Sequence, residues 1–350
     1  MTTNPIIRED CQRICDEMAP MLSALGGKRI LITGASGFLC SYFVDLADAF
    51  NDRNPDTPLE VVALDNFISG WPKRLDAYRD NPHVRVVEHD VAKPFEPDGH
   101  VDFIVHGASI ASPIYYRKHP LETIDVNVNG TWNMLRLATE HHCQGMIQLS
   151  SSEVYGDPDP KRIPTSEDYL GNVSFTGPRA CYDESKRLGE TLSVNYQRIH
   201  GTTVRVVRPF NVYGPGQNLK DRRIIPDLMS AAVEKRPLVL LSDGTPTRSF
   251  CYVTDQIRGI LHVLLKGKPG QSYNVGNDHE ISIRELAETM CDVAGMPRSE
   301  VRFEKSPDPH YLSDNPNRRC PDLTRLRALG WRPLVSLAEG LGRTLESYKV

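Results

Sequence analysis

The stretch Lys28-Arg-Ile-Leu-Ile-Thr-Gly-Ala-Ser-Gly-Phe-Leu-Cys40 decides the fold of this chain. Its first six residues form a short apolar run of the kind found in buried strands, Gly34 and Gly37 follow at once, and 41–50 has a helical pattern. A strand, a glycine turn and a helix in this order open a dinucleotide-binding unit, because glycines let the backbone approach a pyrophosphate at the helix N-terminus. A glycine is usual where Cys40 stands, so we expect helix and strand to sit slightly further apart there.

Apolar runs that alternate with helical segments predict the rest of the fold. Further strands are expected at 60–64, 84–87, 102–106, 145–149 and 203–207. One helix is expected to open at Asn127 and to run through Thr139. The alternation predicts an α/β protein with a Rossmann-type, doubly wound parallel sheet and a smaller C-terminal substrate-binding part.

We expect three regions along the chain. Residues 1–27 form an N-terminal helical extension, with an amphipathic helix over 8–25 that Pro20 could kink. Residues 28–214 form the dinucleotide-binding domain. Residues 215–350 mainly bind substrate and interleave with the first domain, and 307–317 is rich in proline and asparagine, which predicts a loop.

Bulk composition excludes several classes of protein. The 350 residues include 39% hydrophobic and 25% charged residues, as in ordinary soluble domains, and the net charge is −4, which points to neither a nucleic acid nor a membrane as partner. No run of about 18 apolar residues and no secretory signal is present. Eight cysteines lie scattered without C-x-x-C or zinc spacing, which predicts reduced thiols, a cytoplasmic location and no metal site.

Small polar clusters follow the predicted strands, where an open parallel sheet binds its ligands. Asp65, which ends the second strand, can bond the adenosine ribose hydroxyls and would repel a 2′-phosphate, so NAD is favoured over NADP. Asp65 could instead be a simple turn residue. Asp90, after the third strand, could reach the adenine amine.

Tyr182 and Lys186 are four residues apart at the start of an expected helix, so they share one face. An ammonium beside a tyrosine favours the phenolate, so we expect Lys186 to lower the pKa of Tyr182 from its ordinary value near about 10. Such a pair can act as a base that removes a proton from a sugar hydroxyl. A tyrosine and a lysine at this spacing are also common as surface residues without a function. The surrounding motifs must therefore show whether this pair is catalytic.

Those motifs resemble the extended short-chain dehydrogenase/reductase family, the NAD-dependent epimerases and dehydratases of nucleotide sugars. The matching pieces, in family order, are Thr33–Gly37, Asp65-Asn66, Asp90-Val91, Asn127, Ser151–Gly156, Tyr182-x-x-x-Lys186, Arg208–Asn211 and Arg248–Phe250. The segments 152–158, 167–173, 177–187 and 247–253 are most similar to UDP-glucuronate decarboxylases (UDP-xylose synthases).

The resemblance implies NAD as cofactor, a nucleotide-sugar substrate and a homodimer formed through the helix of Tyr182, which Leu188, Leu192 and Tyr196 extend. The implied cofactor-binding residues are Gly34, Ser36, Gly37, Phe38, Leu39, Asp65, Asn66, Asp90, Val91, Ala108, Asn127, Tyr182, Lys186 and Pro209. The implied catalytic residues are Tyr182, Lys186, Ser151, Ser152 and Glu153. The implied substrate-binding residues are Glu153, Asn211, Arg223, Arg248 and Arg319.

The implied reaction is decarboxylation of a nucleotide-linked uronic acid through oxidation at C4, loss of carbon dioxide and re-reduction. A 4-epimerase or a 4,6-dehydratase of the same family is the alternative. Ser152 stands where the dehydratases usually carry an aspartate, which argues against dehydration. Glu153 could place the substrate carboxylate or a proton-donating water. Gly216 stands where the family usually has an arginine, so the nucleotide and the sugar stay open.

Overall fold

The computed structural model describes residues 4–68, 72–221, 223–305 and 316–349. Its central element is a seven-stranded sheet in the order β3-β2-β1-β4-β5-β6-β11, in which every neighbouring pair is parallel. These strands are β1 (Arg29–Thr33), β2 (Glu60–Asp65), β3 (Val84–Glu88), β4 (Phe103–His106), β5 (Gly145–Leu149), β6 (Val204–Pro209) and β11 (Ser272–Val275). The strand order reverses between β1 and β4, which is where such sheets hold their ligands.

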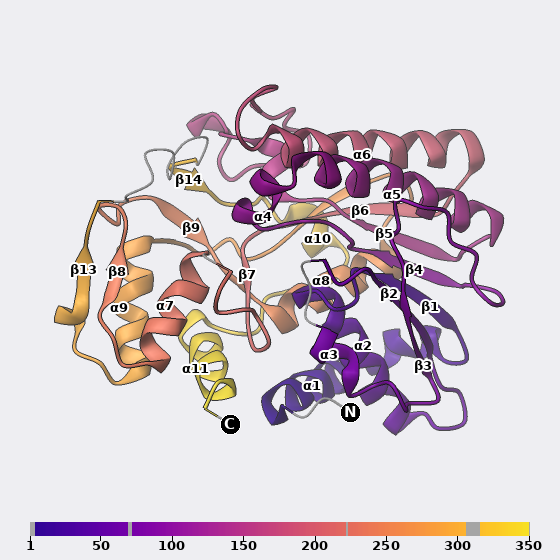
Figure 1. Ribbon diagram of the computed structural model, residues 1–350, viewed down its shortest axis with the longest axis horizontal. Coiled ribbons are helices and arrows are strands. Elements are labelled where there is room, and N and C mark those ends of the chain that lie inside the picture. Colours follow the sequence, from indigo (N-terminus) through magenta and orange to yellow (C-terminus); the bar gives the residue numbers. More distant parts are fainter. Residues whose placement is uncertain (1–3, 69–71, 222, 306–315, 350) are drawn as a thin grey trace.

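Two hydrophobic cores form because successive side chains of a strand point to opposite faces. Along β1, Ile30 and Ile32 enter one core and Leu31 enters the other. The first core lies against α1 (Pro5–Leu22), α2 (Phe38–Arg53) and α8 (Val253–Lys266), and the second against α5 (Pro120–Glu140) and α6 (Ala180–His200). In Figure 1, α5 and α6 accordingly lie above the sheet, with α1 and α2 below it.

The predicted fold class is confirmed, but three helix starts were wrong. The N-terminal helix runs over Pro5–Leu22 instead of 8–25, because Asn4 caps it. The helix after the glycine turn begins at Phe38 rather than Ser41, because Gly37 serves as its N-cap. The helix α5 begins at Pro120, so Asn127 is in the middle of the helix. Proline is favourable at the first helical position, where its missing N–H has no intrahelical partner to lose.

The C-terminal half forms a smaller layer beside the sheet, at the left of Figure 1. Its elements are β7 (Val212–Tyr213), α7 (Ile224–Val233), β8 (Leu238–Leu240), β9 (Thr247–Ser249), β10 (Cys251–Tyr252), β12 (Glu280–Ser282), α9 (Ile283–Ala294), β13 (Val301–Phe303), β14 (Arg318–Arg319), α10 (Thr324–Ala328) and α11 (Leu337–Ser347). This half is interleaved with the first, since β11 completes the main sheet beside β6. Most of the predicted loop at 307–317 lies outside the described residues.

The N-terminal helix α1 is tied to the far end of the chain. Asn4 caps it by accepting hydrogen bonds from the N–H groups of Ile6 and Ile7. Its buried Asp10 accepts from Tyr252 Oη at 2.7 Å and from Arg343 Nη2 at 2.7 Å. Burial raises the pKa of Asp10 to about 6. The predicted extension therefore packs on the body of the protein.

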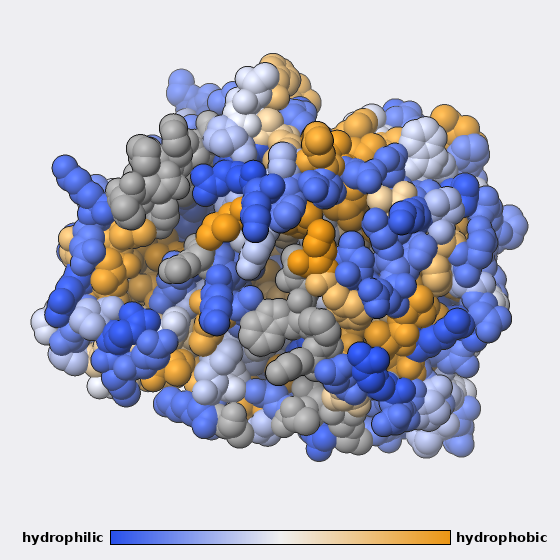
Figure 2. Space-filling view, viewed as in Figure 1, coloured by the Kyte–Doolittle hydropathy of each residue, from blue (hydrophilic) through white to orange (hydrophobic). Residues whose placement is uncertain are grey.

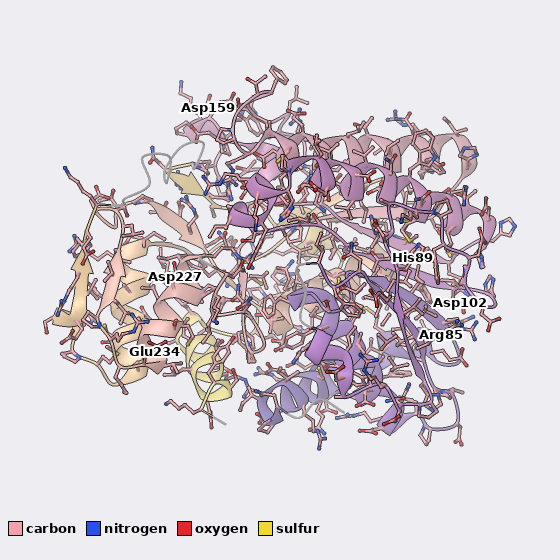
Figure 3. All side chains as sticks on the ribbon, in the orientation of Figure 1. Arg85, His89, Asp102, Asp159, Asp227 and Glu234 are labelled. Carbon is pink, nitrogen blue, oxygen red and sulfur yellow. The ribbon has the colours of Figure 1, made fainter. Side chains whose placement is uncertain are left out.

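Polar contacts hold the amino-terminal edge of the sheet, away from the strand ends that face the ligand cavity. Asp102, which is labelled in Figure 3, precedes β4. Its carboxylate accepts from the Arg29 N–H at 2.9 Å and from Gln144 Nε2 at 2.9 Å. These bonds link the entries of β1, β4 and β5.

Candidate active site

A cavity of about 930 Å³ lies at the carboxyl ends of β1, β2, β4, β5 and β6. Most of the residues predicted for the cofactor line it, namely Gly34, Ser36, Gly37, Phe38, Leu39, Asp65, Asn66, Asp90, Val91, Ala108, Tyr182, Lys186 and Pro209. The predicted Ser151, Ser152, Glu153, Asn211 and Arg223 line it as well. The cavity volume is in the range of sites that hold a cofactor and a small substrate.

The glycine turn forms a cradle in which the backbone is exposed to a ligand. Gly34 has φ +68°, and a Cβ atom there would lie 2.8 Å from Ala108 Cα. Cys40 is accommodated because Gly107 lacks a side chain: a Cβ at Gly107 would lie 2.3 Å from Cys40 Sγ. These two glycines keep the turn open at the start of α2, as a bound pyrophosphate requires.

Asp65 holds the glycine turn in place. Its Oδ2 accepts from the Ser36 N–H at 2.9 Å and from Ser36 Oγ at 2.7 Å, and its Oδ1 accepts from the Phe67 N–H at 2.7 Å. A carboxylate offers about four acceptor positions, so Asp65 retains capacity for a ribose hydroxyl. The turn and ribose interpretations of Asp65 are therefore compatible.

Asn127 is set back from the cavity, whose lining does not include it. It is buried between α5 and α6, and its Nδ2 donates to Ser185 Oγ at 2.9 Å. Its Oδ1 finds no hydrogen-bond partner among the described residues. A donor from a ligand or water would satisfy this atom.

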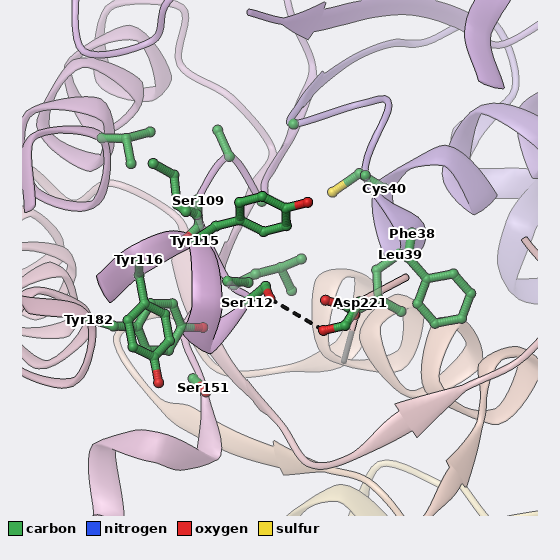
Figure 4. A pocket seen from close by; sticks show the side chains of 18 of the residues that line it. Phe38, Leu39, Cys40, Ser109, Ser112, Tyr115, Tyr116, Ser151, Tyr182 and Asp221 are labelled. Carbon is green, nitrogen blue, oxygen red and sulfur yellow. Dashed lines mark hydrogen bonds between the residues drawn. The ribbon is translucent and has the colours of Figure 1, made fainter. Parts of the chain in front are cut away.

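Tyr182 and Lys186 lie on α6 with their side chains almost fully buried. Lys186 Nζ donates to the carbonyl of Leu149 at 2.9 Å and lies 5.7 Å from the centroid of the Tyr182 ring. Figure 4 shows Ser151 near the hydroxyl of Tyr182 at one end of the cavity, and Ser151 Oγ accepts from the Glu153 N–H at 3.2 Å. Ser152 is buried next to Ser151 at the start of a short 3₁₀ helix, Ser152–Tyr155.

The expected lowering of the pKa of Tyr182 by Lys186 was wrong for this state of the protein. Burial raises the pKa of Tyr182 to about 12, against a smaller lowering by the Ser151 hydrogen bond. Burial also lowers the pKa of Lys186 to about 8. Desolvation disfavours the charged form of each residue and is the largest cause of both pKa shifts. Tyr182 is therefore a neutral phenol at neutral pH.

Two arginines hold Glu153 at this end of the cavity. Arg319 forms two parallel bonds to it, Nη1–Oε1 at 2.5 Å and Nη2–Oε2 at 2.7 Å, and Arg179 Nη2 lies 2.5 Å from Oε2. Although burial opposes ionisation, the two guanidinium groups hold the pKa of Glu153 down to about 2. Glu153 is thus a fixed carboxylate and carries no proton at neutral pH.

Arg248 lies beside this cluster, because β9 and β14 pair in parallel and bring it opposite Arg319. Its guanidinium group donates to the carbonyls of Thr247 at 2.7 Å and Pro316 at 2.6 Å. Burial and the neighbouring Arg319 lower the pKa of Arg248 to about 10. Neither Arg248 nor Arg319 is in the cavity lining, so both predicted substrate residues stand behind Glu153.

The other two predicted substrate residues line the cavity itself. Asn211 Nδ2 donates to the carbonyl of Ser249 at 3.2 Å. Arg223 precedes α7, is exposed and forms an ion pair with Asp221, Nε to Oδ2 at 2.6 Å.

Sequence reasoning missed Arg179 and Tyr116, which both line the cavity. Arg179 lies three residues before Tyr182, at the N-cap of α6, and this position within the 177–187 motif was a usable signal. Tyr116 is on α4 (Pro113–Lys118), and its ring stacks on that of Tyr182. No motif in the sequence indicates that the rings of Tyr116 and Tyr182 stack.

Within the described residues, no cluster of three or more histidine, cysteine, aspartate or glutamate side chains could hold a metal ion. No helix in this part of the chain is long and apolar enough to cross a membrane.

Fold and site together define an α/β enzyme of the dinucleotide-dependent class. The chain belongs to the NAD dependent epimerase/dehydratase family, whose model matches residues 30–276. The glycine cradle and Asp65, which line the cavity, fit the NAD on which this family depends.

Named relatives cover nearly the whole chain. It is 39% identical over 324 residues to UDP-glucuronic acid decarboxylase 6 of Arabidopsis thaliana, covering 92% of this chain and 89% of the relative. It is 36% identical over 329 residues to UDP-glucuronic acid decarboxylase 1 of Xenopus tropicalis, covering 94% of this chain and 74% of the relative.

Solved structures share the fold. The dTDP-glucose 4,6-dehydratase DesIV of Streptomyces venezuelae, crystallised with NAD and TYD, has a TM-score of 0.78 at 30% identity, covering 92% of this chain and 97% of that one. The UDP-glucuronic acid 4-epimerase of Bacillus cereus, crystallised with UDP-glucuronic acid and NAD, has a TM-score of 0.76 at 25% identity, covering 92% and 99%.

Proposed function

We propose that this protein is an NAD-dependent decarboxylase of a nucleotide-linked uronic acid, converting UDP-glucuronate to UDP-xylose. The observation that carries the proposal is the pair of arginines, Arg179 and Arg319, that share the single carboxylate of Glu153 beside Tyr182. Arg179 lines the cavity, whereas Arg319 stands behind Glu153 and neutralises it, so Arg179 is the cation that can bind a substrate carboxylate. Arg179 also lies 3.8 Å from Asp183, a weaker contact. The likeness to UDP-glucuronic acid decarboxylases supports the same substrate.

Tyr182 accepts the proton of the sugar C4 hydroxyl in the first step. Ser151, which lies near the Tyr182 hydroxyl, bonds the same C4 oxygen and aligns it. When bound, NAD supplies a cationic nicotinamide ring that takes the C4 hydride and later returns it. Lys186, anchored on the carbonyl of Leu149, adds positive charge behind the phenolate as it forms.

The C4 ketone makes carbon dioxide a good leaving group, because C4 is β to the C6 carboxylate. The C5–C6 bond breaks, its electron pair enters an enolate spanning C5, C4 and the C4 oxygen, and carbon dioxide leaves. The enolate then takes a proton at C5, and the proton on Tyr182 returns to the C4 oxygen when C4 is reduced. Glu153 is ionised and paired, so in this scheme it orients Arg179 and Arg319, and the C5 proton comes from water.

A product assay over nucleotide sugars tests the proposal. The purified protein is incubated with NAD and, separately, UDP-glucuronate, UDP-galacturonate, UDP-glucose and dTDP-glucose, and products are identified by mass spectrometry. The proposed decarboxylase activity predicts that UDP-glucuronate is converted to a UDP-pentose without net reduction of NAD. UDP-galacturonate as the sole product would establish an epimerase instead, and loss of water from dTDP-glucose would establish a dehydratase.

We also propose a homodimer formed through α5 and α6. The outer faces of these helices expose large apolar side chains: Leu121, Ile124, Trp132, Leu188 and Ile199. Figure 2 shows hydrophobic side chains gathered over this region of the surface. An exposed apolar patch of this kind on two long helices favours a second copy packed antiparallel against it. Trp132→Asp should yield a monomer by light scattering; an unchanged mass would contradict the proposed interface.

The remaining proposals concern organisation and location. Residues 28–214 hold the cofactor and residues 215–350 mainly the substrate, with residues 1–27 as an extension packed on both. We propose a cytoplasmic location, which the eight free thiols support because cysteines persist unpaired in a reducing compartment. Localisation of a tagged full-length chain by microscopy tests this proposal.

A further inference from the structure

Tyr116 is a large, buried side chain in the cavity lining, and the proposed reaction gives it no role. It lies on α4 with 1% of its surface exposed. Its ring and that of Tyr182 are nearly parallel, at 15°, with centroids 5.1 Å apart. Figure 4 shows the rings of Tyr116 and Tyr182 overlapping in the view. Together with Ile110 they form a small apolar cluster separate from the main cores.

The helix α4 is anchored on both sides, so the Tyr116 ring is held firmly. Ser112, its N-cap residue, donates from Oγ to the carbonyl of Asp221 at 3.5 Å, a bond drawn in Figure 4. At its other end Cys181 Sγ donates to the carbonyl of Tyr116 at 3.6 Å, which ties α4 to the first turn of α6. Cys181 directly precedes Tyr182, so this tie fixes the two stacked rings relative to each other.

The Tyr116 hydroxyl does not explain this arrangement. It is buried and has no hydrogen-bond partner among the described residues. A buried hydroxyl without a partner lowers stability, whereas an aromatic pair gains from offset stacking beyond its buried area. Among the described residues, the ring is therefore the part of the Tyr116 side chain that makes a specific contact.

We propose that Tyr116 is a positioning residue for the proposed base Tyr182: its stacked ring holds the Tyr182 ring in one rotamer, with the hydroxyl against Ser151, and keeps water from that end of the cavity. The inference deepens the proposed function and rests on the role of Tyr182 in it. A base that is already aligned loses less freedom when the sugar C4 hydroxyl arrives. The high burial of Tyr182, whose pKa stands at about 12, agrees with a dry site.

Two variants distinguish the contribution of the Tyr116 ring from that of its hydroxyl. Tyr116→Phe keeps the stacked ring and removes the unpartnered hydroxyl, so we expect wild-type kcat and unchanged or raised thermal stability. Tyr116→Leu removes the ring, and we expect kcat to fall about twofold to twelvefold, because an aromatic pair contributes about 0.5–1.5 kcal/mol. The KM should stay within about twofold, because Tyr116 does not hold the nucleotide sugar in this account.

The first half-reaction gives a readout that is independent of decarboxylation. Rapid mixing of the NAD-loaded protein with UDP-glucuronate, followed by the near-ultraviolet absorbance of reduced nicotinamide, reports C4 oxidation alone. The inference is supported if Tyr116→Leu slows this step and Tyr116→Phe restores it. If both variants slow C4 oxidation equally, the hydroxyl rather than the ring is responsible and the inference is wrong. If wild type and both variants oxidise C4 at the same rate, Tyr116 has no role in this step and the inference is also wrong. If C4 is oxidised but no carbon dioxide appears, the proposed function is wrong. The rate of C4 oxidation in the Tyr116 variants still tests the inference about Tyr116 in that case.

Discussion

Replacing Glu153 by glutamine removes one negative charge from a buried cluster while keeping the size of the side chain. The wild-type carboxylate is bound by Arg319 through two bonds and by Arg179 through one, and its side chain is 17% exposed. In the variant both guanidinium groups stay buried without their counter-charge. Arg248, itself lowered in pKa by burial and by Arg319, lies directly behind them.

The size of the effect follows from the pKa of Glu153. A fall from 4.5 to about 2 corresponds to about 3 kcal/mol of stability at neutral pH. Removal of one partner from a buried ion pair costs about 3–5 kcal/mol in general. We therefore expect Glu153→Gln to lower the free energy of unfolding by about 3 kcal/mol.

The pH dependence gives this prediction a second test. Because the folded pKa is below the ordinary value, the stabilisation is fully present above pH 4.5 and is lost as the pH falls toward 2. Urea unfolding followed by tryptophan fluorescence, at about pH 7 and about pH 3, measures both free energies. The gap between wild type and variant should be about 3 kcal/mol at the higher pH and less than half of that at the lower one.

Glu140→Gln is the matched control, because Glu140 faces Arg136 at 3.6 Å with a side chain that is 54% exposed. An exposed pair contributes less than about 1 kcal/mol. If Glu153→Gln is as mild as Glu140→Gln, or if its effect does not change with pH, Glu153 is not the ionised centre of a buried cluster and the reasoning is refuted.

Three further outcomes are expected. Tyr182→Phe should abolish C4 oxidation while NAD still co-purifies with the protein, as measured by absorbance after rapid mixing; unchanged turnover would remove Tyr182 from the mechanism. Because burial lowers the pKa of Lys186 to about 8, kcat/KM should fall as the pH rises through about 8 and the lysine loses its charge; a flat profile across that pH would contradict this role. Gly34→Ala should lower both thermal stability and NAD affinity in calorimetry, since its Cβ would lie 2.8 Å from Ala108 Cα at φ +68°; wild-type affinity would show that the cradle tolerates a side chain.

Local patterns were enough to predict the fold. The run from Lys28 to Cys40 is the observed strand, turn and helix start, and the later strands lie within one or two residues of their predicted ends. The exception at α5 arose because polar Asn127 was taken as a helix start, whereas Pro120 is the residue that begins the helix. A proline at a first helical position was the signal that would have corrected it.

The site was harder to predict where it depends on contacts between distant segments. Glu153, Arg179 and Arg319 come from a short 3₁₀ helix, a helix cap and a two-residue strand, and no sequence spacing relates them. A sequence motif also does not show how deeply its residues are buried. The i, i+4 spacing of Tyr182 and Lys186 correctly indicates that they share a helix face. It implies the wrong direction for the pKa shift of Tyr182. Desolvation depends on the whole fold around a side chain.

The release of the substrate carboxyl group tests the central claim most directly. UDP-glucuronate labelled with radioactive carbon at C6 is incubated with the protein and a catalytic amount of NAD, and volatile label is trapped while the nucleotide sugar is recovered. The proposed function predicts that label leaves as carbon dioxide in proportion to UDP-xylose formed, over many turnovers for each NAD. Retention of all label in a nucleotide-linked uronic acid, with only the C4 configuration changed, would contradict it.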